Sequence, residues 1–169
     1  MKNLAIFCLL FVFVSCATTP PVTTLSLYDR DEVSWFFENG TGRIEGDGFL
    51  RRNDGMLVKC AGNQVGIFPV SEYATERITN LYGSPNGGYN TAGYGTRQVD
   101  EADPLYLQDA KMQTCDVDGK FSFSNLPAGE YYVLTRVTWK INDYYFEGGD
   151  IARKVSVENE STTKVTLTN

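Results

Sequence analysis

The clearest pattern along the chain is an alternation with a period of two between residues 131 and 141. One set of positions carries Tyr131, Val133, Thr135, Val137, Trp139 and Ile141. The positions between them carry Tyr132, Leu134, Arg136, Thr138 and Lys140. Because successive side chains of a β-strand point to opposite faces, this pattern predicts a half-buried strand whose first set faces the core.

Other short apolar segments lie between Gly, Asn, Asp and Pro residues, and no stretch shows a convincing amphipathic helix. Asp118-Gly119 is a dipeptide favoured in tight hairpin turns. The predicted strands are 42–51, 56–60, 65–70, 111–115, 120–123, 131–141, one beginning at Val155 and Val157, and one at Val165 and Leu167. The pattern therefore predicts one all-β domain, an antiparallel Greek-key sandwich of about seven strands.

Residues 80–106 break this pattern, because they are rich in Gly and Tyr and poor in aliphatic side chains. A loop this long is usually functional or disordered. Tyr offers a rigid contact surface with a polar tip, and Gly lets the backbone adapt, as in binding loops. The segment is thus either a binding loop or a loose insertion. Its candidate contact residues are Tyr82, Tyr89, Tyr94 and Tyr106.

The N-terminal residues 1–16 have the pattern of a secretory signal, with Lys2 followed by an apolar run too short to span a bilayer. Phe13-Val14-Ser15-Cys16 resembles the lipobox of bacterial lipoproteins. The resemblance implies removal of residues 1–15 and attachment of a diacylglycerol and an N-acyl chain such as palmitate to Cys16. An ordinary secretory signal with a chance cysteine is the alternative.

If Cys16 is lipidated, the protein is anchored to a membrane of the bacterial cell envelope, and Ala17 in place of Asp favours the outer membrane. The Thr- and Pro-rich residues that follow suit a semi-extended tether. We therefore expect a tether over residues 16–40 and the folded domain over 41–169.

Two cysteines remain once Cys8 leaves with the signal and Cys16 takes lipid. An exported protein with two cysteines favours a disulfide between Cys60 and Cys115. Two buried free thiols are the alternative.

Composition excludes several classes of function. The chain of 169 residues contains no His, which removes Ser-His-Asp and Cys-His nucleophiles and His-ligated zinc. Its formal net charge of −6 argues against nucleic acid as a partner. Asp116-x-Asp118-Gly119 lacks the further ligands of an EF-hand and predicts a turn rather than a calcium site. We expect no metal and no cofactor.

The segment 115–138, CDVDGKFSFSNLPAGEYYVLTRVT, resembles the carboxypeptidase regulatory-like, transthyretin-like (prealbumin-like) β-sandwich family. Gly42-x-Ile44-x-Gly46, residues 65–69 and the late Val pairs resemble its other strands. The resemblance implies a non-catalytic accessory domain. The hydroxyisourate hydrolases of this fold use His residues and a C-terminal Tyr-Arg-Gly-Ser, both of which are missing here.

The leading hypothesis is a lipid-anchored envelope protein whose sandwich is a non-catalytic binding or structural module for a protein or glycan partner. An inhibitor or exclusion factor is the nearest alternative. A glycan-acting enzyme is a third reading, with carboxylates drawn from Glu45, Asp47, Asp100, Glu101 and Asp103. Trp35-Phe36-Phe37 is expected to cover an open end of the sandwich rather than form an exposed patch.

Overall fold

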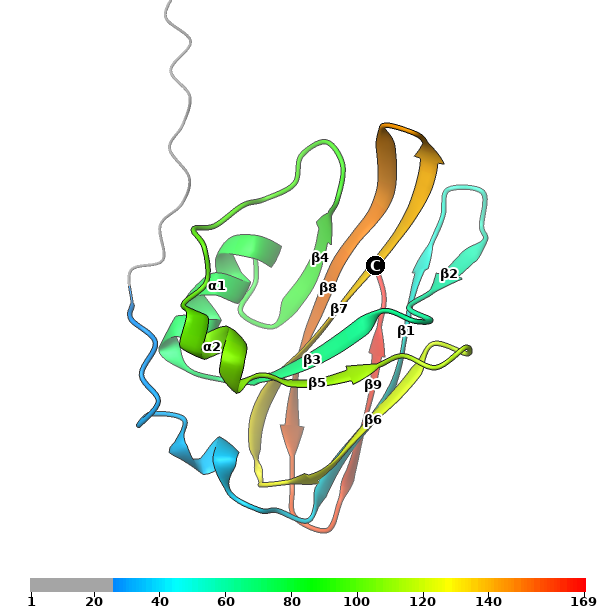
Figure 1. The fold of residues 1–169 in the computed structure, drawn as a ribbon. Helices are drawn as coiled ribbons and strands as arrows, with labels where there is room; N and C mark the ends of the chain where they lie inside the picture. The colour runs from blue at the N-terminus through cyan, green and yellow to red at the C-terminus, as the bar shows by residue number, and fades with distance from the viewer. Residues whose placement is uncertain (1–25) are drawn as a thin grey trace, which may run out of the picture.

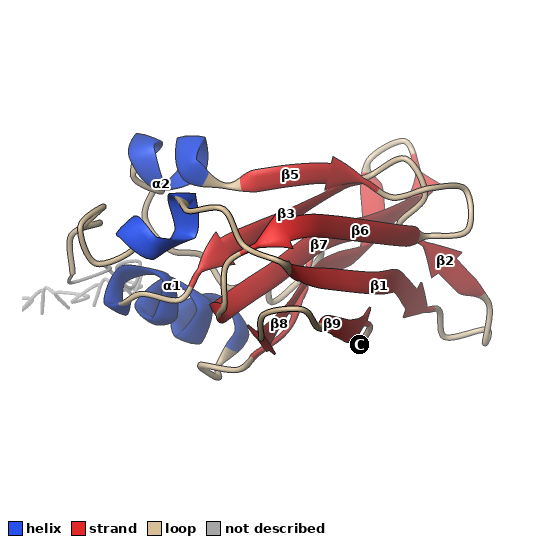
Figure 2. Ribbon diagram, turned by 90° about the horizontal axis from the view of Figure 1, so that it is seen from below, coloured by secondary structure: helices blue, strands red, loops and turns tan. Residues whose placement is uncertain are grey.

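A computed structural model of the chain describes residues 26–169, which form two packed β-sheets with helices gathered at one end (Figures 1 and 2). The expected signal peptide, residues 1–15, and the lipidation site Cys16 lie outside the described residues. No helix within residues 26–169 has the length and apolar character needed to cross a membrane.

The smaller sheet is built around β1 (Gly42–Arg51). The N-terminal half of β1 lies between β6 (Lys120–Leu126) and β9 (Thr162–Leu167), and its C-terminal end pairs with β2 (Leu57–Lys59). β1 and β9 run parallel, which departs from the expected all-antiparallel arrangement. A parallel neighbour is possible here because β9 is the last strand and reaches β1 from the far end of the chain rather than through a hairpin.

The larger sheet has the strand order β4-β8-β7-β3-β5, and every neighbouring pair is antiparallel. Its strands are β3 (Gln64–Pro69), β4 (Gly87–Thr91), β5 (Lys111–Thr114), β7 (Gly129–Asn142) and β8 (Tyr145–Val157). The predicted all-β sandwich is therefore confirmed; within the described residues it has nine strands rather than about seven, and the β1–β9 pair is the exception to the predicted antiparallel pairing.

The main core lies between the two sheets, and the alternation in β7 supplies much of it. Tyr131, Val133 and Val137 are fully buried there, and Thr135 donates from Oγ1 to the carbonyl of Gln64 at 2.8 Å. Ile141 was expected in this core but is 46% exposed. It lies where the β7–β8 register shifts near the hairpin tip, beyond the reach of the smaller sheet.

The expectation that Val155 and Val157 begin a strand is wrong, because these residues end β8, which starts at Tyr145. Charged residues and the pair Gly148-Gly149 hide the alternation in the first half of β8. The strand forms there because it pairs with β7 along nearly its whole length, so the partner rather than local propensity determines its start.

Helices cover the face of the larger sheet that points away from the main core. The sequence pattern predicted no amphipathic helix, and this expectation is wrong. The helix α1 (Glu72–Tyr82) is capped by Ser71, whose side chain accepts from the amide of Ala74, and ends at Gly83 with φ 79°. Tyr73, Ala74 and Ile78 are its buried residues. These three residues form one narrow apolar stripe, which is too short to stand out as an amphipathic pattern in the sequence.

A second helix, α2 (Pro104–Asp109), begins inside the segment predicted as a loop. Asp103 accepts a hydrogen bond from the amide of Leu105 at 2.8 Å, and Pro104 occupies the first turn. Both are signals of a helix start. Together the helices bury Tyr132 of β7 on the face opposite the main core.

Residues 26–40 were expected to belong to the tether, yet they pack against the domain. Asp109 of α2 is almost completely buried and accepts two hydrogen bonds from the Arg30 guanidinium, at 2.9 Å and 2.6 Å. It also accepts one from Tyr28 at 2.9 Å, and burial together with this bond raises the pKa of Tyr28. The N-terminal segment is thereby held against the helices.

The short 3-10 helix η1 (Ser34–Phe37) closes one end of the sandwich. Phe36 is fully buried in the main core, as expected for the Trp35-Phe36-Phe37 cluster. Trp35 packs edge-on against Tyr131, and a side chain at Gly129 would collide with its ring. Lys111 lies 4.4 Å from the centre of the Phe36 ring, and burial lowers the pKa of its ammonium group.

The predicted disulfide between Cys60 and Cys115 is confirmed. Cys60 follows β2 of the smaller sheet and Cys115 follows β5 of the larger sheet, so the bond joins the two layers. Both residues are buried within the main core.

We predict that the double variant Cys60→Ala/Cys115→Ala loses about 4 kcal/mol of unfolding free energy, because the bond closes a loop with a sequence separation of 55. Urea unfolding followed by circular dichroism measures this loss. The unmutated protein with dithiothreitol should unfold at nearly the same urea concentration as the variant. Equal stability of the oxidised and reduced proteins would contradict the prediction.

Candidate functional site

The β7–β8 ribbon extends further than the strands on either side of it. β3 accompanies β7 only as far as Thr135, and β4 accompanies β8 only from Gly149 onward. The distal part of the ribbon, from Thr138 and Gly148 to the turn, pairs only with itself. In Figure 1 its tip lies beside the tip of the β1–β2 hairpin and the loop after β4. Chain segments from both sheets therefore meet at this end of the sandwich.

A cleft of about 260 Å³ opens at this meeting point, and we call it the end cleft. Its walls come from the end of β1 and the turn after it, from β4, from the distal β7–β8 ribbon, and from the residue at 169. The end cleft is lined by Arg51, Arg52, Asn53, Tyr89, Thr91, Trp139, Tyr145, Glu147, Gly148 and Asn169.

The aromatic side chains of the end cleft continue the inner face of the larger sheet. Trp139 and Glu147 are cross-strand partners, two positions beyond the pair Val137 and Gly149 at the edge of the core. Tyr145 lies two positions before Glu147 on β8, nearer the turn, and therefore points to the same side of the sheet. Beyond the main core, the inner face of the sheet therefore carries large side chains that each have a polar group.

Trp139 forms the inner part of this surface. Its ring packs partly against the main core, and its Nε1 donates to Glu147 Oε2 at 3.1 Å. Gly148, with φ 100°, allows the ring to lie close to β8, since a Cβ there would be 3.0 Å from the Trp139 ring and 2.1 Å from the carbonyl oxygen of Val137. Tyr89 is also fixed, because its hydroxyl donates to the carbonyl of Gly148 at 2.7 Å.

Arg52 supplies the cationic group of the end cleft. Its guanidinium carbon lies 5.8 Å from the centre of the Trp139 ring, and Nη2 forms an ion pair with Asp54 at 3.2 Å. Arg51 is directed elsewhere, since its Nη1 donates to the carbonyl of Gly55 in the β1–β2 turn. The end cleft therefore brings together aromatic rings, one oriented guanidinium and one carboxylate.

The four tyrosines predicted as one contact surface are divided by the structure. Tyr89 lines the end cleft and Tyr94 is fully exposed in the loop after β4. Tyr82 ends α1, and burial raises the pKa of its phenol. Tyr106 is only 5% exposed and stacks on Phe68 with ring centres 4.7 Å apart.

The prediction of a long loop over residues 80–106 is therefore wrong in its extent, and Tyr106 cannot contact a partner in the folded state. The segment holds the end of α1, all of β4 and the first turn of α2. β4 forms because it adds to the edge of β8, a long-range pairing that no local pattern reveals. Burial also raises the pKa of Tyr106, so its hydroxyl stays protonated.

The carboxylates proposed for glycan chemistry do not gather in one place. Glu45 and Asp47 lie on the outer face of the smaller sheet, whereas Asp103 caps α2 beside the larger sheet. The side chains that line the end cleft include one carboxylate, Glu147. Within residues 26–169 no group of three or more Cys, Asp or Glu side chains is placed to hold a metal ion. The segment Asp116-x-Asp118-Gly119 forms a turn between β5 and β6, in which Asp116 Oδ1 accepts hydrogen bonds from the amides of Asp118 and Lys120.

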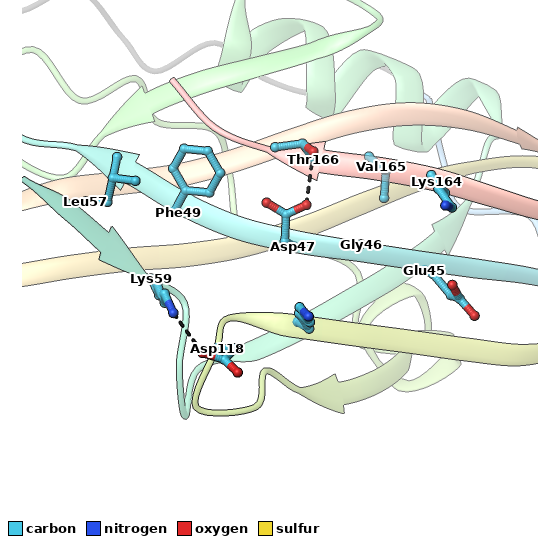
Figure 3. Close-up of a pocket in the computed structure, with 11 residues that line it drawn as sticks. Glu45, Gly46, Asp47, Phe49, Leu57, Lys59, Asp118, Lys164, Val165 and Thr166 are labelled. Carbon is cyan, nitrogen blue, oxygen red and sulfur yellow. Dashed lines mark hydrogen bonds and ion pairs between the residues drawn. The ribbon is translucent and has the colours of Figure 1, made fainter.

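A larger concavity of about 630 Å³ lies on the outer face of the smaller sheet, and we call it the sheet groove (Figure 3). Lys59 forms an ion pair with Asp118 at 3.0 Å, which lowers the pKa of that carboxyl, and Thr166 donates to Asp47 at 3.1 Å. Its six charged side chains are Glu45, Asp47, Lys59, Asp118, Lys120 and Lys164. These charges balance, and they are typical of a solvated sheet face with complementary cross-strand pairs.

The sheet groove is the weaker candidate despite its size, because Phe49 is its one aromatic side chain and its other apolar side chains are Leu57 and Val165. The end cleft offers three aromatic side chains, Tyr89, Trp139 and Tyr145, among polar groups that the strands hold in position. Trp139 was assigned to the core by its place in the alternation, and Arg52, Tyr145 and Glu147 were not singled out. The β7–β8 hairpin places Trp139 beside Glu147 and Tyr145, and the turn after β1 adds Arg52 from a distant part of the chain.

We predict opposite outcomes for two tyrosines that the sequence placed in one loop. Tyr106→Ala should lower the unfolding free energy by about 3–5 kcal/mol, because it removes a buried ring from the cluster under the helices. Tyr94→Ala should change it by less than about 0.5 kcal/mol, since this side chain is fully exposed. Thermal or urea unfolding of both variants measures the difference, and similar losses would show that the two environments are assigned wrongly.

Comparisons with known proteins identify no family for this chain. No protein-family model matches it. No curated protein matches it either. The solved structures that are similar to it include the following two. One is a Pseudomonas aeruginosa protein provisionally described as carbohydrate-binding, with a TM-score of 0.69 and 26% identity over 84% of this chain and 97% of that chain. The other is GBS52, the minor pilin of Streptococcus agalactiae, with a TM-score of 0.39 and 17% identity over 78% of this chain and 44% of that chain. This likeness is too weak to support an inference. The chain thus shares its β-sandwich fold with the Pseudomonas aeruginosa protein.

Proposed function

We propose that this domain is a non-catalytic carbohydrate-binding module and that the end cleft is its ligand site. The observation that carries the proposal is the convergence of Trp139, Tyr145 and Tyr89 with Arg52 and Glu147 in one small cleft. Sugar rings have apolar C–H faces that pack on aromatic rings, and hydroxyl groups that need both donors and acceptors. The end cleft offers both kinds of surface.

The end cleft offers hydrogen-bond donors and acceptors that suit the hydroxyl groups of a sugar. Glu147 uses Oε2 for Trp139, which leaves Oε1 as an acceptor. Arg52 uses Nη2 for Asp54, which leaves Nε and Nη1 as donors. Tyr145 lines the end cleft, and its hydroxyl can both donate to and accept from a ligand. Adjacent donors and acceptors suit the vicinal hydroxyls of a sugar.

The fold similarity supports the same ligand class. The Pseudomonas aeruginosa protein, which is provisionally described as carbohydrate-binding, aligns with most of this chain. Fold alone does not imply function, so the proposal depends on the end cleft and uses the similarity as support. Hydrolysis by paired carboxylates would need a second acid near Glu147. A non-catalytic role is therefore the reading we favour over a glycan-acting enzyme.

We also propose that the protein acts in the bacterial cell envelope, anchored by lipid at Cys16, most consistent with the outer membrane. The lipobox-like residues 13–16 support the anchor. The disulfide supports an oxidising compartment outside the cytoplasm. A module in this place would hold glycans at the cell boundary.

An inhibitor or exclusion factor that binds a protein is the second candidate. The observation that favours it is the pair of fully exposed rings at Tyr94 and Tyr144, which are 101% and 97% exposed. Exposed tyrosines are frequent in protein contact surfaces. Both rings lie outside the lining of the end cleft, so variants at these positions separate the two functions.

The first test measures binding of the full chain to an array of glycans ending in glucose, galactose, mannose or N-acetylglucosamine, in a detergent without a sugar headgroup. Tyr145→Ala should weaken binding about tenfold or more, because the ring supplies a contact face for the ligand. The matched control is Phe146→Ala, a neighbouring aromatic residue that is 51% exposed and points to the other side of β8.

Glu147→Gln, which keeps the shape of the side chain, should also weaken binding. Binding that is unchanged in Tyr145→Ala and Glu147→Gln, or equally reduced in Phe146→Ala, would refute the end cleft as the site. Loss of a protein partner in Tyr94→Ala and Tyr144→Ala, without any glycan binding, would support the inhibitor reading instead.

The anchor is tested by the intact mass of protein extracted from membranes, before and after reduction and thiol alkylation. We expect a mature chain that begins at Cys16 and carries three acyl chains. Cys60 and Cys115 should be alkylated only after reduction, because they form the disulfide. An unmodified Cys16 would refute the lipid anchor, and it would leave the glycan proposal to be judged on binding alone.

A further inference from the structure

We propose that the loop over residues 91–97 belongs to the binding site as its support. It holds Tyr145 in position in the end cleft, and Asn90 and Gly93 are its positioning residues. This inference rests on the proposed function and deepens it, because it names residues that act on the ligand through another side chain. The loop follows β4 and lies beside the tip of the β7–β8 ribbon (Figure 1).

Tyr145 stands at a place where the larger sheet gives little support. It is the first residue of β8 and pairs with Asn142 across the turn, next to a shift in the β7–β8 register. The pairing of β3 with the ribbon ends at Thr135, and that of β4 ends at Gly149. Segments with few neighbours open locally at a low cost in free energy. A ring at this tip therefore needs a further contact to keep one orientation.

Gly93 supplies that contact. A Cβ at this glycine would lie 3.1 Å from the hydroxyl oxygen of Tyr145, and 3.6 Å and 3.7 Å from its ring carbons Cε2 and Cζ. The backbone of Gly93 therefore packs against the phenol end of the ring. The room that a side chain would need is taken by the hydroxyl, whereas the ring carbons lie at ordinary van der Waals distance. Tyr145 thus lies between the end cleft, which it lines, and the loop.

Asn90 closes the base of the loop. Its side chain is only 5% exposed, Oδ1 accepts from the amide of Arg97 at 2.9 Å, and Nδ2 donates to the Arg97 carbonyl at 3.0 Å. The side-chain amide of Asn90 is therefore used on the backbone of one residue. Arg97 in turn packs on the end of α1, where a Cβ at Gly83 would collide with its guanidinium. The base of the loop is held between β4 and α1.

The remainder of the loop is braced from within and tied to the ribbon. Thr96 Oγ1 donates to the carbonyls of Thr91 and Gly93, at 2.7 Å and 2.6 Å. The amide of Ala92 donates to the carbonyl of Gly148 at 2.8 Å. The loop therefore meets the cleft tyrosine as a preformed part of the fold. A side chain already held in its binding orientation loses less freedom when a ligand binds.

The experiment follows the ring signal of Tyr145 in the full chain with ¹³C-labelled tyrosine, and Tyr145→Phe identifies that signal. Gly93→Ala places a methyl group 3.1 Å from the hydroxyl oxygen, so the signal should shift in the protein without sugar. The midpoint of urea unfolding should stay the same, because the change lies in a surface loop. Asn90→Ala should shift or broaden the same signal, because it releases the base of the loop.

The methyl glycosides of glucose, galactose, mannose and N-acetylglucosamine are the probes for binding. Gly93→Ala should weaken the best of them about threefold to tenfold, the cost of ordering one side chain on binding. In the Tyr145→Phe background the same change should alter the dissociation constant less than about twofold, because the hydroxyl that it collides with is absent. Tyr94→Ala, the next residue along, is fully exposed and serves as the matched control. It should change neither the Tyr145 signal nor binding.

An unchanged Tyr145 signal in both Gly93→Ala and Asn90→Ala would overturn the inference. So would a loss of binding in Gly93→Ala that is equally large in the Tyr145→Phe background, since the loop would then act without Tyr145. Both results leave the proposed function standing, because a sugar still binds. Shifted Tyr145 signals without binding of any methyl glycoside, or of any glycan on the array, would instead refute the proposed function. Asn90 and Gly93 would then only shape the hairpin tip.

Discussion

The length of the β7–β8 ribbon relative to the sheet that covers it is the constraint from which the candidate site follows. β7 has 14 residues and β8 has 13, whereas β1, the longest strand of the smaller sheet, has 10. An inner face that runs beyond its cover cannot remain aliphatic without exposing apolar surface to water. At this point the chain changes from Val137 and Ile151 to Trp139, Tyr145 and Glu147, which combine large surfaces with polar groups.

The opposite end of the sandwich shows how the same problem is solved by closure. Phe36 enters the main core from η1, Lys111 bonds to its carbonyl at 2.9 Å, and Trp35 covers the start of β7. The helices cover the outer side of the larger sheet, where Tyr132 and Tyr106 are buried. In the end cleft, by contrast, Trp139 and Tyr145 remain accessible and are fixed in position by the strands that carry them.

The sequence predicted the elements whose signals are local. The alternation in β7, the bounds of β1, the Asp118-Gly119 turn and the pairing of Cys60 with Cys115 follow from periodicity, turn chemistry and the number of cysteines left. The signals of α2 were also local, because Asp103 and Pro104 form a helix start, but they were read as part of a loop. β4 could not be predicted, since it forms a strand by pairing with β8, which is distant in the chain. The first half of β8 pairs across the hairpin turn with the end of β7, and its glycines and charged residues hide the alternation. The candidate site also depends on contacts between distant segments, since β4 brings Tyr89 and the turn after β1 brings Arg52 to the β7–β8 hairpin. For that reason the whole Gly- and Tyr-rich segment was predicted to bind, although Tyr89 is the one of its four tyrosines that lines the cleft.

The structure of the protein with its tightest-binding glycan tests the central claim most directly, because it separates the end cleft from the larger sheet groove. The account predicts a sugar ring in contact with Trp139 and Tyr145, with hydroxyls bonded to Glu147 and Arg52. A sugar bound in the sheet groove, beside Phe49 and Lys120, would contradict the account and move the site to the outer face of the smaller sheet.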